Sequence, residues 1–541
     1  MRLQRLKGLL VTALVHVVGA LSVDIPSVPV VNLGYAQYQG RYNATTNIAE
    51  YIGLRFAAPP TGIWRWMPPQ APAPVHGIQL ATEHPPRCIA AKAPPAAERN
   101  IYRDVVKRAP TQQSEDCLFL SVYYPGRTPP KDPLPVIVWI HGGAYVLGSS
   151  EGFNGGNIVE TSGHDVVVVT IQYRLGIFGF LSSGKIKTSG APNAGLLDQQ
   201  FALRWVQKHI GKFGGDPSKV TIWGESAGGG SVLMHLIAND GKTSPPLFRA
   251  AIAGSPCLLP QYQFNHPIVE SVYDSVVAQA GCASSGNTLT CLRSADVQLL
   301  DAANSNISAG SFIGTYIALP VVDGSFIKQR PSVAFKQGNV NKAKLLTFTN
   351  ANETQRESIP ENMDAAYWAL NTFPLFSNAE AITAAKIYAG LGSPARQVSI
   401  MVSEITFQCP VLSTLTAFPD AYKGVFAVPP ALHGMDLAFY FKDSSMFRFF
   451  QRPEYNNPVF ANAFTRAFTN FAKTLDPNPT PGTPDAALVP RWESYANNRM
   501  EMVFNMTEEG RPNIKAEKIN GMLVNRCAFW NDRRILELTA Q

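Results

Sequence analysis

Unbroken apolar runs predict the strands in the first half of the chain. The clearest runs are residues 134–140, 165–173 and 219–223, which are rich in valine and isoleucine. A strand that is apolar on both faces is covered on both faces, which is typical of a mostly parallel sheet. Between the last two runs, residues 198–212 carry apolar side chains at helical spacing. This alternation predicts an α/β fold.

The second half adds elements of both kinds. Residues 344–348 and 437–441 are predicted strands, and the proline-rich residues 476–490 are predicted to form an irregular surface loop. The aromatic stretch 439–450 predicts either the wall of an apolar pocket or plain core packing. Four aromatic residues recur at the spacing of a core-facing helix: Phe460, Phe464, Phe468 and Phe471.

The first residues indicate where the protein works. Three basic residues precede an apolar run at 8–21, and small residues follow it. This pattern predicts a cleaved signal peptide at residues 1–22 rather than a membrane anchor, because a span needs roughly 20 apolar residues. No repeat and no Gly/Ser linker divides the rest, so we expect residues 23–541 to form a single domain of a secreted protein.

Secretion changes how the seven cysteines are interpreted. None forms a Cys-x-x-Cys pair, which disfavours a zinc ribbon, and no metal site is predicted. An oxidising compartment allows up to three disulfides. Cys282 and Cys291 are close enough in sequence to close a small loop. Cys257, inside an apolar stretch, is the expected buried free thiol.

Glycosylation motifs and charge add two further expectations. Asn43, Asn306 and Asn505 begin Asn-x-Ser/Thr motifs and are candidate glycan sites. Asn352 begins a fourth, but it lies beside a candidate catalytic residue, so we do not expect it to be used. The net charge of +7 is spread along the chain without a basic run. Nucleic-acid binding is therefore not predicted.

The strongest chemical motif is Gly224-Glu225-Ser226-Ala227-Gly228. Glycine and serine are common, so the motif alone is weak evidence. Here it follows a predicted strand and precedes a predicted helix at residues 227–238. In that context the serine sits on a strained turn with its oxygen exposed, and the helix start faces a developing anion. The motif predicts Ser226 as a nucleophile.

A nucleophilic serine needs hydrogen-bond donors for the oxyanion that its attack creates. The backbone N–H of Ala227 is one predicted donor. The glycine-rich loop at residues 141–145, which follows a predicted strand, is the expected source of the others. A glycine-rich loop can also bind phosphate, but the nearest match, Gly241-Lys242-Thr243, has Leu236 where the first glycine belongs.

Histidine order along the chain selects the base. Proteins with this elbow carry the serine, then the acid, then the histidine. Three histidines follow Ser226. His235 lies on the helix that leaves the elbow, and His266 precedes any plausible acid. His433, on a loop, is therefore the predicted general base.

The acid must lie between Ser226 and His433, at the end of a strand. Glu353 follows a predicted strand directly and is the preferred candidate. Glu357 is an alternative close by. Asp323 is another, although its surroundings, Val-Val-Asp-Gly, look more like a turn. The acid's role is to fix the tautomer of His433 and stabilise the imidazolium.

Together these motifs resemble those of the type-B carboxylesterase/lipase family, the branch of the α/β-hydrolase fold that includes cholinesterases and fungal lipases. The resemblance covers nearly the whole chain after the signal peptide. It is carried by the elbow and by three further segments: residues 114–120 (Ser-Glu-Asp-Cys-Leu-Phe-Leu), 173–176 (Tyr-Arg-Leu-Gly) and 213–217 (Phe-Gly-Gly-Asp-Pro).

The resemblance implies an α/β-hydrolase fold and assigns further roles. Its oxyanion donors fall on Gly143, Ala144 and Ala227. Its disulfides fall on Cys88–Cys117 and Cys282–Cys291, and Cys409–Cys527 resembles the third bridge of cholinesterases. The family's acid motif usually has Asp before the Glu and Gly after it; here Asn352 and Thr354 stand there.

The predicted activity is hydrolysis of carboxylic esters through an acyl-enzyme, with no cofactor. Family lipases carry a lid with an apolar underside inside the first disulfide loop. In this chain the loop from Cys88 to Cys117 is rich in alanine, proline and charge. We therefore expect soluble or moderately apolar ester substrates rather than the aggregated substrates of an interfacial lipase or sterol esterase, with at most a transient contact with lipid. A non-catalytic adhesion protein of the same fold is the alternative from another class.

Overall fold

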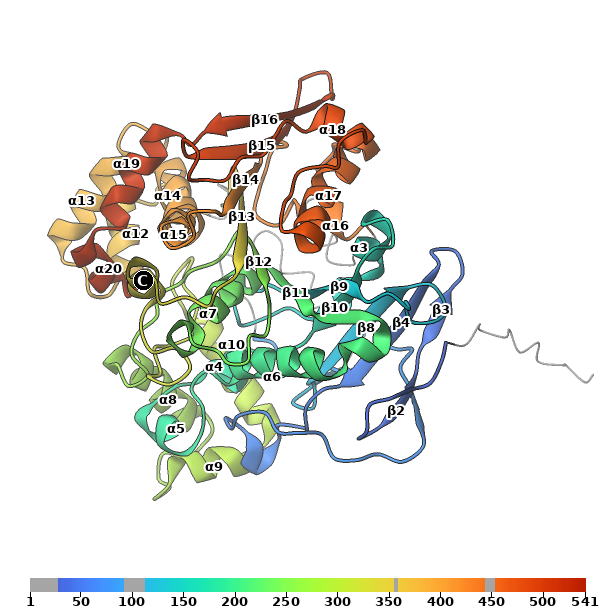
Figure 1. The fold of residues 1–541 in the computed structure, drawn as a ribbon. Coiled ribbons are helices and arrows are strands. Elements are labelled where there is room, and N and C mark those ends of the chain that lie inside the picture. The colour runs from blue at the N-terminus through green and yellow to red at the C-terminus, as the bar shows by residue number, and fades with distance from the viewer. Residues whose placement is uncertain (1–27, 92–111, 355–358, 443–452) are drawn as a thin grey trace, which may run out of the picture.

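The computed structural model describes residues 28–91, 112–354, 359–442 and 453–541. The predicted signal peptide and most of the loop between Cys88 and Cys117 lie outside these ranges. Over the described residues, eleven strands form one sheet that crosses the molecule (Figure 1). Their order across the sheet is β16 (Pro512–Lys518), β15 (Met500–Met506), β14 (Tyr422–Phe426), β13 (Lys344–Asn350), β12 (Ala250–Gly254), β11 (Gly215–Glu225), β9 (Leu134–Ile140), β10 (Val167–Ile171), β8 (Phe119–Pro125), β4 (Ile48–Arg55) and β3 (Arg41–Asn43).

The middle of the sheet is parallel and both of its edges are antiparallel. From β10 through β9, β11, β12, β13 and β14 to β15, neighbouring strands run in the same direction. The hairpin of β15 and β16 closes one edge, and β8, β4 and β3 close the other. The predicted mostly parallel sheet is confirmed at its centre. The antiparallel edges were not predicted.

Two small sheets and the helices complete the fold. The small sheets pair β1 (Val31–Asn32), β2 (Gln37–Gln39) and β5 (Ile78–Leu80), and β6 (Arg87–Cys88) with β7 (Gln113–Ser114). The helices are α3 (Gly156–Thr161), α4 (Gly176–Phe180), α5 (Gly184–Ser189), α6 (Ala194–His209), α7 (Ala227–Gly241), α8 (Pro267–Gln279), α9 (Thr288–Ser294), α10 (Val297–Ala309), α11 (Pro331–Gln337), α12 (Ala365–Thr372), α13 (Asn378–Tyr388), α14 (Pro394–Ser403), α15 (Cys409–Leu415), α16 (Leu437–Tyr440), α17 (Pro458–Thr474), α18 (Pro484–Leu488), α19 (Gly521–Trp530) and α20 (Arg533–Thr539).

Helices cover both faces of the sheet, which explains why its strands read as unbroken apolar runs. α6 and α7 pack on one face, where Leu203 and Leu233 join a large buried cluster with Val136 and Val138 of β9. α3 and α17 cover the other face. The predicted stripe on α17 is confirmed: Phe460, Phe464, Phe468 and Phe471 are all buried.

Two predictions of local structure were wrong. Residues 437–441 form no strand, because Leu437–Tyr440 is the short helix α16. This helix packs on α17, so Phe439 and Tyr440 insert among the phenylalanines of that helix. A short apolar run does not distinguish a strand from a buried helical turn. The proline-rich segment 476–490 also contains a helix, α18, which begins at Pro484 because proline fits the first turn.

The disulfide predictions are confirmed. Cys88–Cys117, Cys282–Cys291 and Cys409–Cys527 are bonded, and Cys257 is a buried free cysteine. Over the described residues, one helical run, Pro394–Leu415, is long and apolar enough to cross a membrane. Most of it is buried within the protein, as is usual for a core helix.

Candidate active site

Ser226 lies on a sharp turn between the end of β11 and the start of α7. Its backbone adopts φ 58° and ψ −123°, a conformation that side-chain-bearing residues rarely take. The turn is possible because glycines flank it. A Cβ on Gly228 would lie 2.0 Å from the carbonyl oxygen of Ile140, and one on Gly224 would lie 2.4 Å from the backbone of Gly228. The predicted strand, turn and helix therefore form as expected.

The three predicted catalytic side chains form one hydrogen-bonded chain. Nε2 of His433 lies 2.9 Å from Oγ of Ser226, and Nδ1 of His433 lies 2.7 Å from Oε2 of Glu353. The serine and the histidine are 207 residues apart in sequence, so only the fold brings them together. This geometry is that of a nucleophile, a base and an orienting acid.

Glu353 and His433 lie on two loops that are tied to each other. Glu353 follows β13, and His433 lies between β14 and α16. A backbone bridge joins Asn352 to Leu432, and Asn352 also donates from its side chain to the carbonyl of Pro430 at 2.9 Å. These contacts fix the separation of the two loops, and thereby that of the carboxylate and the imidazole.

The carboxylate oxygen of Glu353 that does not face His433 also has hydrogen-bond partners. Its Oε1 accepts hydrogen bonds from Oγ of Ser255 at 2.8 Å and from the backbone N–H of Asn350 at 2.7 Å. The residue is only 3% exposed. The carboxylate is therefore held in one orientation, with Oε2 directed at His433.

The alternative acid Asp323 does not meet the histidine. Asp323 is a turn-capping residue, as its surroundings suggested. Its Oδ1 accepts from the backbone N–H groups of Ser325, Phe326 and Ile327, and its Oδ2 accepts from Asn193. Glu357 lies outside the described residues.

The glycine-rich loop after β9 passes directly beside Ser226. A Cβ on Gly142 would lie 2.9 Å from Cβ of Ser226. Gly143 and Ala144 both have positive φ, at 113° and 53°. Within the described ranges, the backbone N–H groups of these two residues donate to no protein acceptor. Ala227, as the first residue of α7, has an N–H without a helical partner.

His141 holds the glycine-rich loop in place through its contacts with Tyr173. Its ring is buried and stacks on Tyr173 at 4.5 Å between ring centroids, and Tyr173 donates its hydroxyl to the carbonyl of His141 at 2.8 Å. Burial lowers the pKa of His141 to about 4, so the ring is neutral at physiological pH. It therefore anchors the loop without adding charge to the site.

Sequence reasoning missed two acids that surround the base. Oε1 of Glu225 lies 3.3 Å from Nε2 of His433, and Asp436 is bonded to Asn350 at 3.1 Å. Both carboxyls are buried. Glu225 is the variable residue of the elbow motif, and Asp436 follows His433 by three positions. An acidic residue directly before a nucleophile was the available signal.

Burial changes the acid–base properties of this cluster. It raises the pKa of Glu225 to about 8, although His433 opposes the shift, and it raises that of Asp436 to about 6. Burial alone would lower the pKa of His433, but the charges of Glu225 and Glu353 outweigh it and raise the pKa to about 9. A charged Glu225 therefore favours the imidazolium form of His433.

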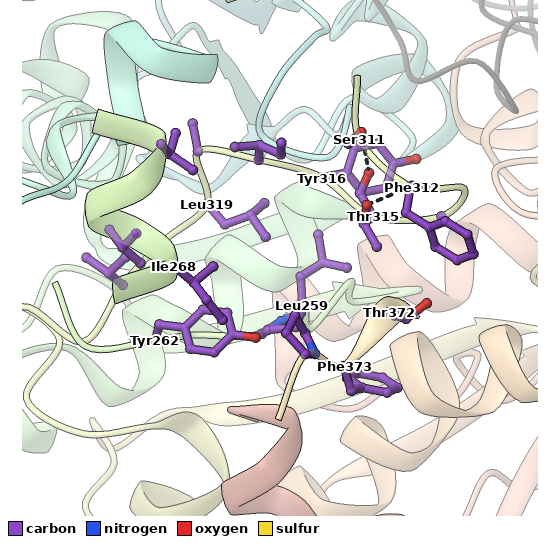
Figure 2. Close-up of a pocket in the computed structure, with 18 of the residues that line it drawn as sticks. Leu259, Tyr262, Ile268, Ser311, Phe312, Thr315, Tyr316, Leu319, Thr372 and Phe373 are labelled. Atoms are coloured by element: carbon purple, nitrogen blue, oxygen red, sulfur yellow. Dashed lines mark hydrogen bonds between the residues drawn. The ribbon is translucent and has the colours of Figure 1, made fainter. Parts of the chain in front are cut away.

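An apolar cavity of about 370 Å³ lies next to the site. Figure 2 shows Leu259, Tyr316 and Leu319 among the side chains that line it, with Ile268 and Phe373 further along its wall. Leu259, Tyr316 and Leu319 also pack with Phe407, whose ring lies 4.5 Å from that of His433. Phe407 therefore connects the lining of the cavity to His433. The sequence left open whether the aromatic stretch 439–450 forms a pocket wall or packs in the core. Its residues Phe439, Tyr440 and Phe441 are in the core.

In the described parts of the chain, no three His, Cys, Asp or Glu side chains are grouped so as to hold a metal ion.

The sequence profile of the carboxylesterase family matches residues 27–530. The chain belongs to the carboxylesterase family. It is therefore a carboxylic ester hydrolase with the α/β-hydrolase fold, and the non-catalytic alternative is set aside.

Relatives of this esterase include enzymes named as esterases and as lipases. Carboxylesterase patB of Aspergillus clavatus is 32% identical over 85% of this chain and 90% of its own length. A secreted lipase of Arthroderma benhamiae is 30% identical over 84% of this chain and 89% of its own. Among solved structures, Aspergillus niger EstA matches with a TM-score of 0.81 and 29% identity, covering 95% of this chain and 99% of EstA.

Proposed function

We propose that this esterase is a secreted serine hydrolase that cleaves esters with an apolar chain through an acyl-enzyme on Ser226. The observation that carries the proposal is the continuous hydrogen-bonded chain from Ser226 through His433 to Glu353. Each member occupies the position that its chemical role requires.

The first half-reaction acylates the serine. Oγ of Ser226 attacks the ester carbonyl while Nε2 of His433 takes its proton, and the carbonyl oxygen becomes an oxyanion. The N–H groups of Gly143, Ala144 and Ala227 are the proposed donors to that oxyanion. The imidazolium then gives its proton to the alcohol oxygen, the carbon–oxygen bond breaks, and the alcohol leaves.

The second half-reaction repeats these steps with water. His433 removes a proton from a water molecule, which attacks the acyl carbonyl, and the proton passes to Oγ of Ser226 as the acid departs. Throughout, Glu353 holds Nδ1–H of His433 and stabilises the imidazolium. The buried Glu225 beside Nε2 supplies a second stabilising carboxyl, because the imidazolium lowers its pKa.

The apolar cavity supports the substrate class. Its lining is mostly aliphatic and aromatic, and it lies beyond Phe407 from the triad. Burial of each additional methylene there stabilises binding by about 0.8 kcal/mol. We therefore propose monomeric esters with a medium-length apolar chain as the preferred substrates.

Secretion is supported by three disulfides and by a relative that is named a secreted lipase. Asn43 and Asn306 are exposed and Asn505 is partly exposed, so all three are proposed glycan sites. Asn352 is already engaged with Pro430, which fits the expectation that it carries no glycan.

Hydrolysis of a chain-length series of 4-nitrophenyl esters and of emulsified triglycerides tests this proposal, with Ser226→Ala as the control. We expect saturation below the solubility limit, an optimum at medium chain length, and a loss of about 10⁶-fold in kcat for the variant. A rate that rises only when an oil–water interface appears would instead identify an interfacial lipase. Retained activity in Ser226→Ala would overturn the proposed nucleophile.

A further inference from the structure

A single π-helical turn, η5 (Glu404–Gln408), interrupts the long helix between α14 and α15. The backbone remains helical on both sides, so the turn is an insertion within one continuous helix rather than a break. Such turns are rare and occur frequently at functional sites. This one lies directly beside the triad.

The five residues of η5 face three different surroundings. Ile405 and Thr406 line the apolar cavity of about 370 Å³. Glu404 and Gln408 line a second, polar cavity of about 390 Å³, which also reaches the loop that carries Glu353. The remaining residue, Phe407, is 7% exposed and packs against the ring of His433 with centroids 4.5 Å apart. The turn thus separates two cavities and presents an aromatic ring to the base.

The hydrogen bonds of His433 do not fix the orientation of its ring plane, so the ring needs a contact against its face. Ser226 and Glu353 bind opposite edges of the imidazole. Rotation of the ring about the axis through Nδ1 and Nε2 leaves both nitrogen atoms in place, so these two bonds alone do not fix the ring plane. A bulky side chain against the face prevents this movement. The face of a phenyl ring also attracts a cation, which favours the imidazolium that forms during the reaction.

Buried polar contacts hold η5 from the side away from His433. Glu404 is 3% exposed and accepts from Nη2 of Arg526 at 2.6 Å and from the hydroxyl of Tyr388 at 2.9 Å. The neighbouring residue of Arg526, Cys527, is bonded to Cys409 at the end of the turn. Helix α19 therefore clamps η5 at both ends.

The same helical segment contacts the acid as well as the base. Oγ of Ser403, the last residue of α14, accepts from the backbone N–H of Glu353 at 3.3 Å. On the opposite side, the carbonyl of Thr406 accepts from the backbone N–H of Leu258 at 3.0 Å, close to the elbow. The segment from Ser403 to Phe407 thus touches the base, the acid's backbone and the loop after β12 that carries Leu258.

We propose that Phe407 is a positioning residue for His433, and that the Glu404–Arg526 pair positions Phe407 by holding the π-turn. The inference rests on the proposed function, because it assigns His433 the role of general base. It separates positioning from substrate binding, since Glu404 lines the polar cavity and, among the described residues, is not part of the lining of the apolar cavity.

Steady-state kinetics of Phe407→Leu test the proposal, with Phe418→Leu as the matched control. Phe418 is also 7% exposed, but it packs in the main core away from His433. With 4-nitrophenyl acetate, whose acyl group is too short to need the apolar cavity, we expect kcat of Phe407→Leu to fall about 10-fold to 100-fold with little change in KM. The control should keep kcat. Equal losses in the two variants would overturn the proposal.

The proton on Nδ1 of His433 gives a second readout that is independent of turnover. Bonded to Glu353, it should give a downfield proton resonance in the wild type and in Phe418→Leu, and an exchange-broadened one in Phe407→Leu. A sharp, unshifted resonance in Phe407→Leu would contradict the positioning role.

Glu404→Gln tests the clamp, because it keeps the side-chain shape but removes the charge that pairs with Arg526. We expect a smaller fall in kcat, about threefold to 10-fold, again without a matching change in KM. An unchanged kcat would restrict the role to Phe407 and overturn the second half of the proposal. Ser226→Ala separates a failure of the proposed function from a failure of the positioning role. If Ser226→Ala remains active, the proposed function fails. If Ser226→Ala is inactive and Phe407→Leu has a normal kcat, only the positioning role fails.

Discussion

The proposed nucleophile and the proposed acid–base pair of this esterase are built in opposite ways. Ser226 is placed by residues that adjoin it in sequence: a strand before it, a helix after it, and glycines whose missing side chains let the turn close. Glu353 and His433 lie on loops 80 residues apart. They are placed by each other, by a bridge between their loops, and by Ser255, Asn350 and Phe407 from three separate segments.

This difference indicates which residues of the site can be substituted without loss of the fold. The elbow turn closes because its glycines carry no Cβ, so replacing Gly224 or Gly228 acts on folding. The acid–base pair depends on a network of side-chain contacts, and a substitution there can alter chemistry while the fold remains intact. The predictions below compare the two regions by separating their effects on rate and on stability.

Among substitutions that leave Ser226 in place, the largest effect is expected at the acid. Glu353→Gln replaces the acceptor of Nδ1–H by an amide that can present its own N–H to the ring, so His433 is held in the wrong tautomer. We expect kcat to fall about 10⁴-fold, because the equivalent change in a serine protease triad has that effect. The variant should retain its fold, since the amide still fits the pocket. Rates over the pH range and a thermal melt measure both quantities.

Asp323→Asn is the matched control, because Asp323 was the alternative acid and is also buried. It caps a turn through backbone N–H groups, so its substitution should lower the free energy of unfolding by about 1–3 kcal/mol. Its kcat per folded molecule should stay close to that of the wild type. A large loss of kcat in Asp323→Asn with a normal Glu353→Gln would reverse the assignment of the acid.

What the sequence could predict follows the same division. Ser226, its strand and its helix were predictable because every residue that shapes them lies within a short segment. His433 was found by elimination along the chain and Glu353 from its position after a strand, although the bonds between them depend on the fold. Glu225, Asp436 and Phe407 were not assigned roles, since nothing local shows that they surround one imidazole. Helix α16 was mistaken for a strand because its partner, α17, comes later in the chain.

An intermediate effect is expected from Glu225, which belongs to the elbow in sequence but to the acid–base pair in function. The free base must be neutral to accept the serine proton, so kcat/KM rises with pH through the pKa of His433. The charge of Glu225 raises that pKa. Glu225→Gln should therefore shift the acid limb of the kcat/KM profile to lower pH, by about one unit. It should also lower kcat, because the imidazolium loses a stabilising neighbour.

The pH profile of kcat/KM from pH 5 to 10 measures this shift, with Glu509→Gln as the control because Glu509 is exposed on a surface turn. The control should leave the acid limb in place. If the limb moves to higher pH in Glu225→Gln, then Glu225 does not stabilise the imidazolium, and the position of the acid limb is set by Glu353 alone.

The smallest effect is expected at Cys257, which lies against the elbow without taking part in the chemistry. Its backbone N–H donates to the carbonyl of Ser226 at 3.0 Å, while its thiol is buried and burial raises its pKa far out of the physiological range. A protonated, enclosed thiol is a poor nucleophile and acts as a small apolar side chain. Cys257→Ala keeps the backbone bond and removes only the sulfur, so it should cost about 1 kcal/mol of unfolding free energy and leave kcat unchanged. Chemical denaturation and steady-state rates measure the two quantities. A large loss of kcat at wild-type stability would show that the elbow, like the acid–base pair, depends on side-chain contacts, and the distinction between the two regions would not hold.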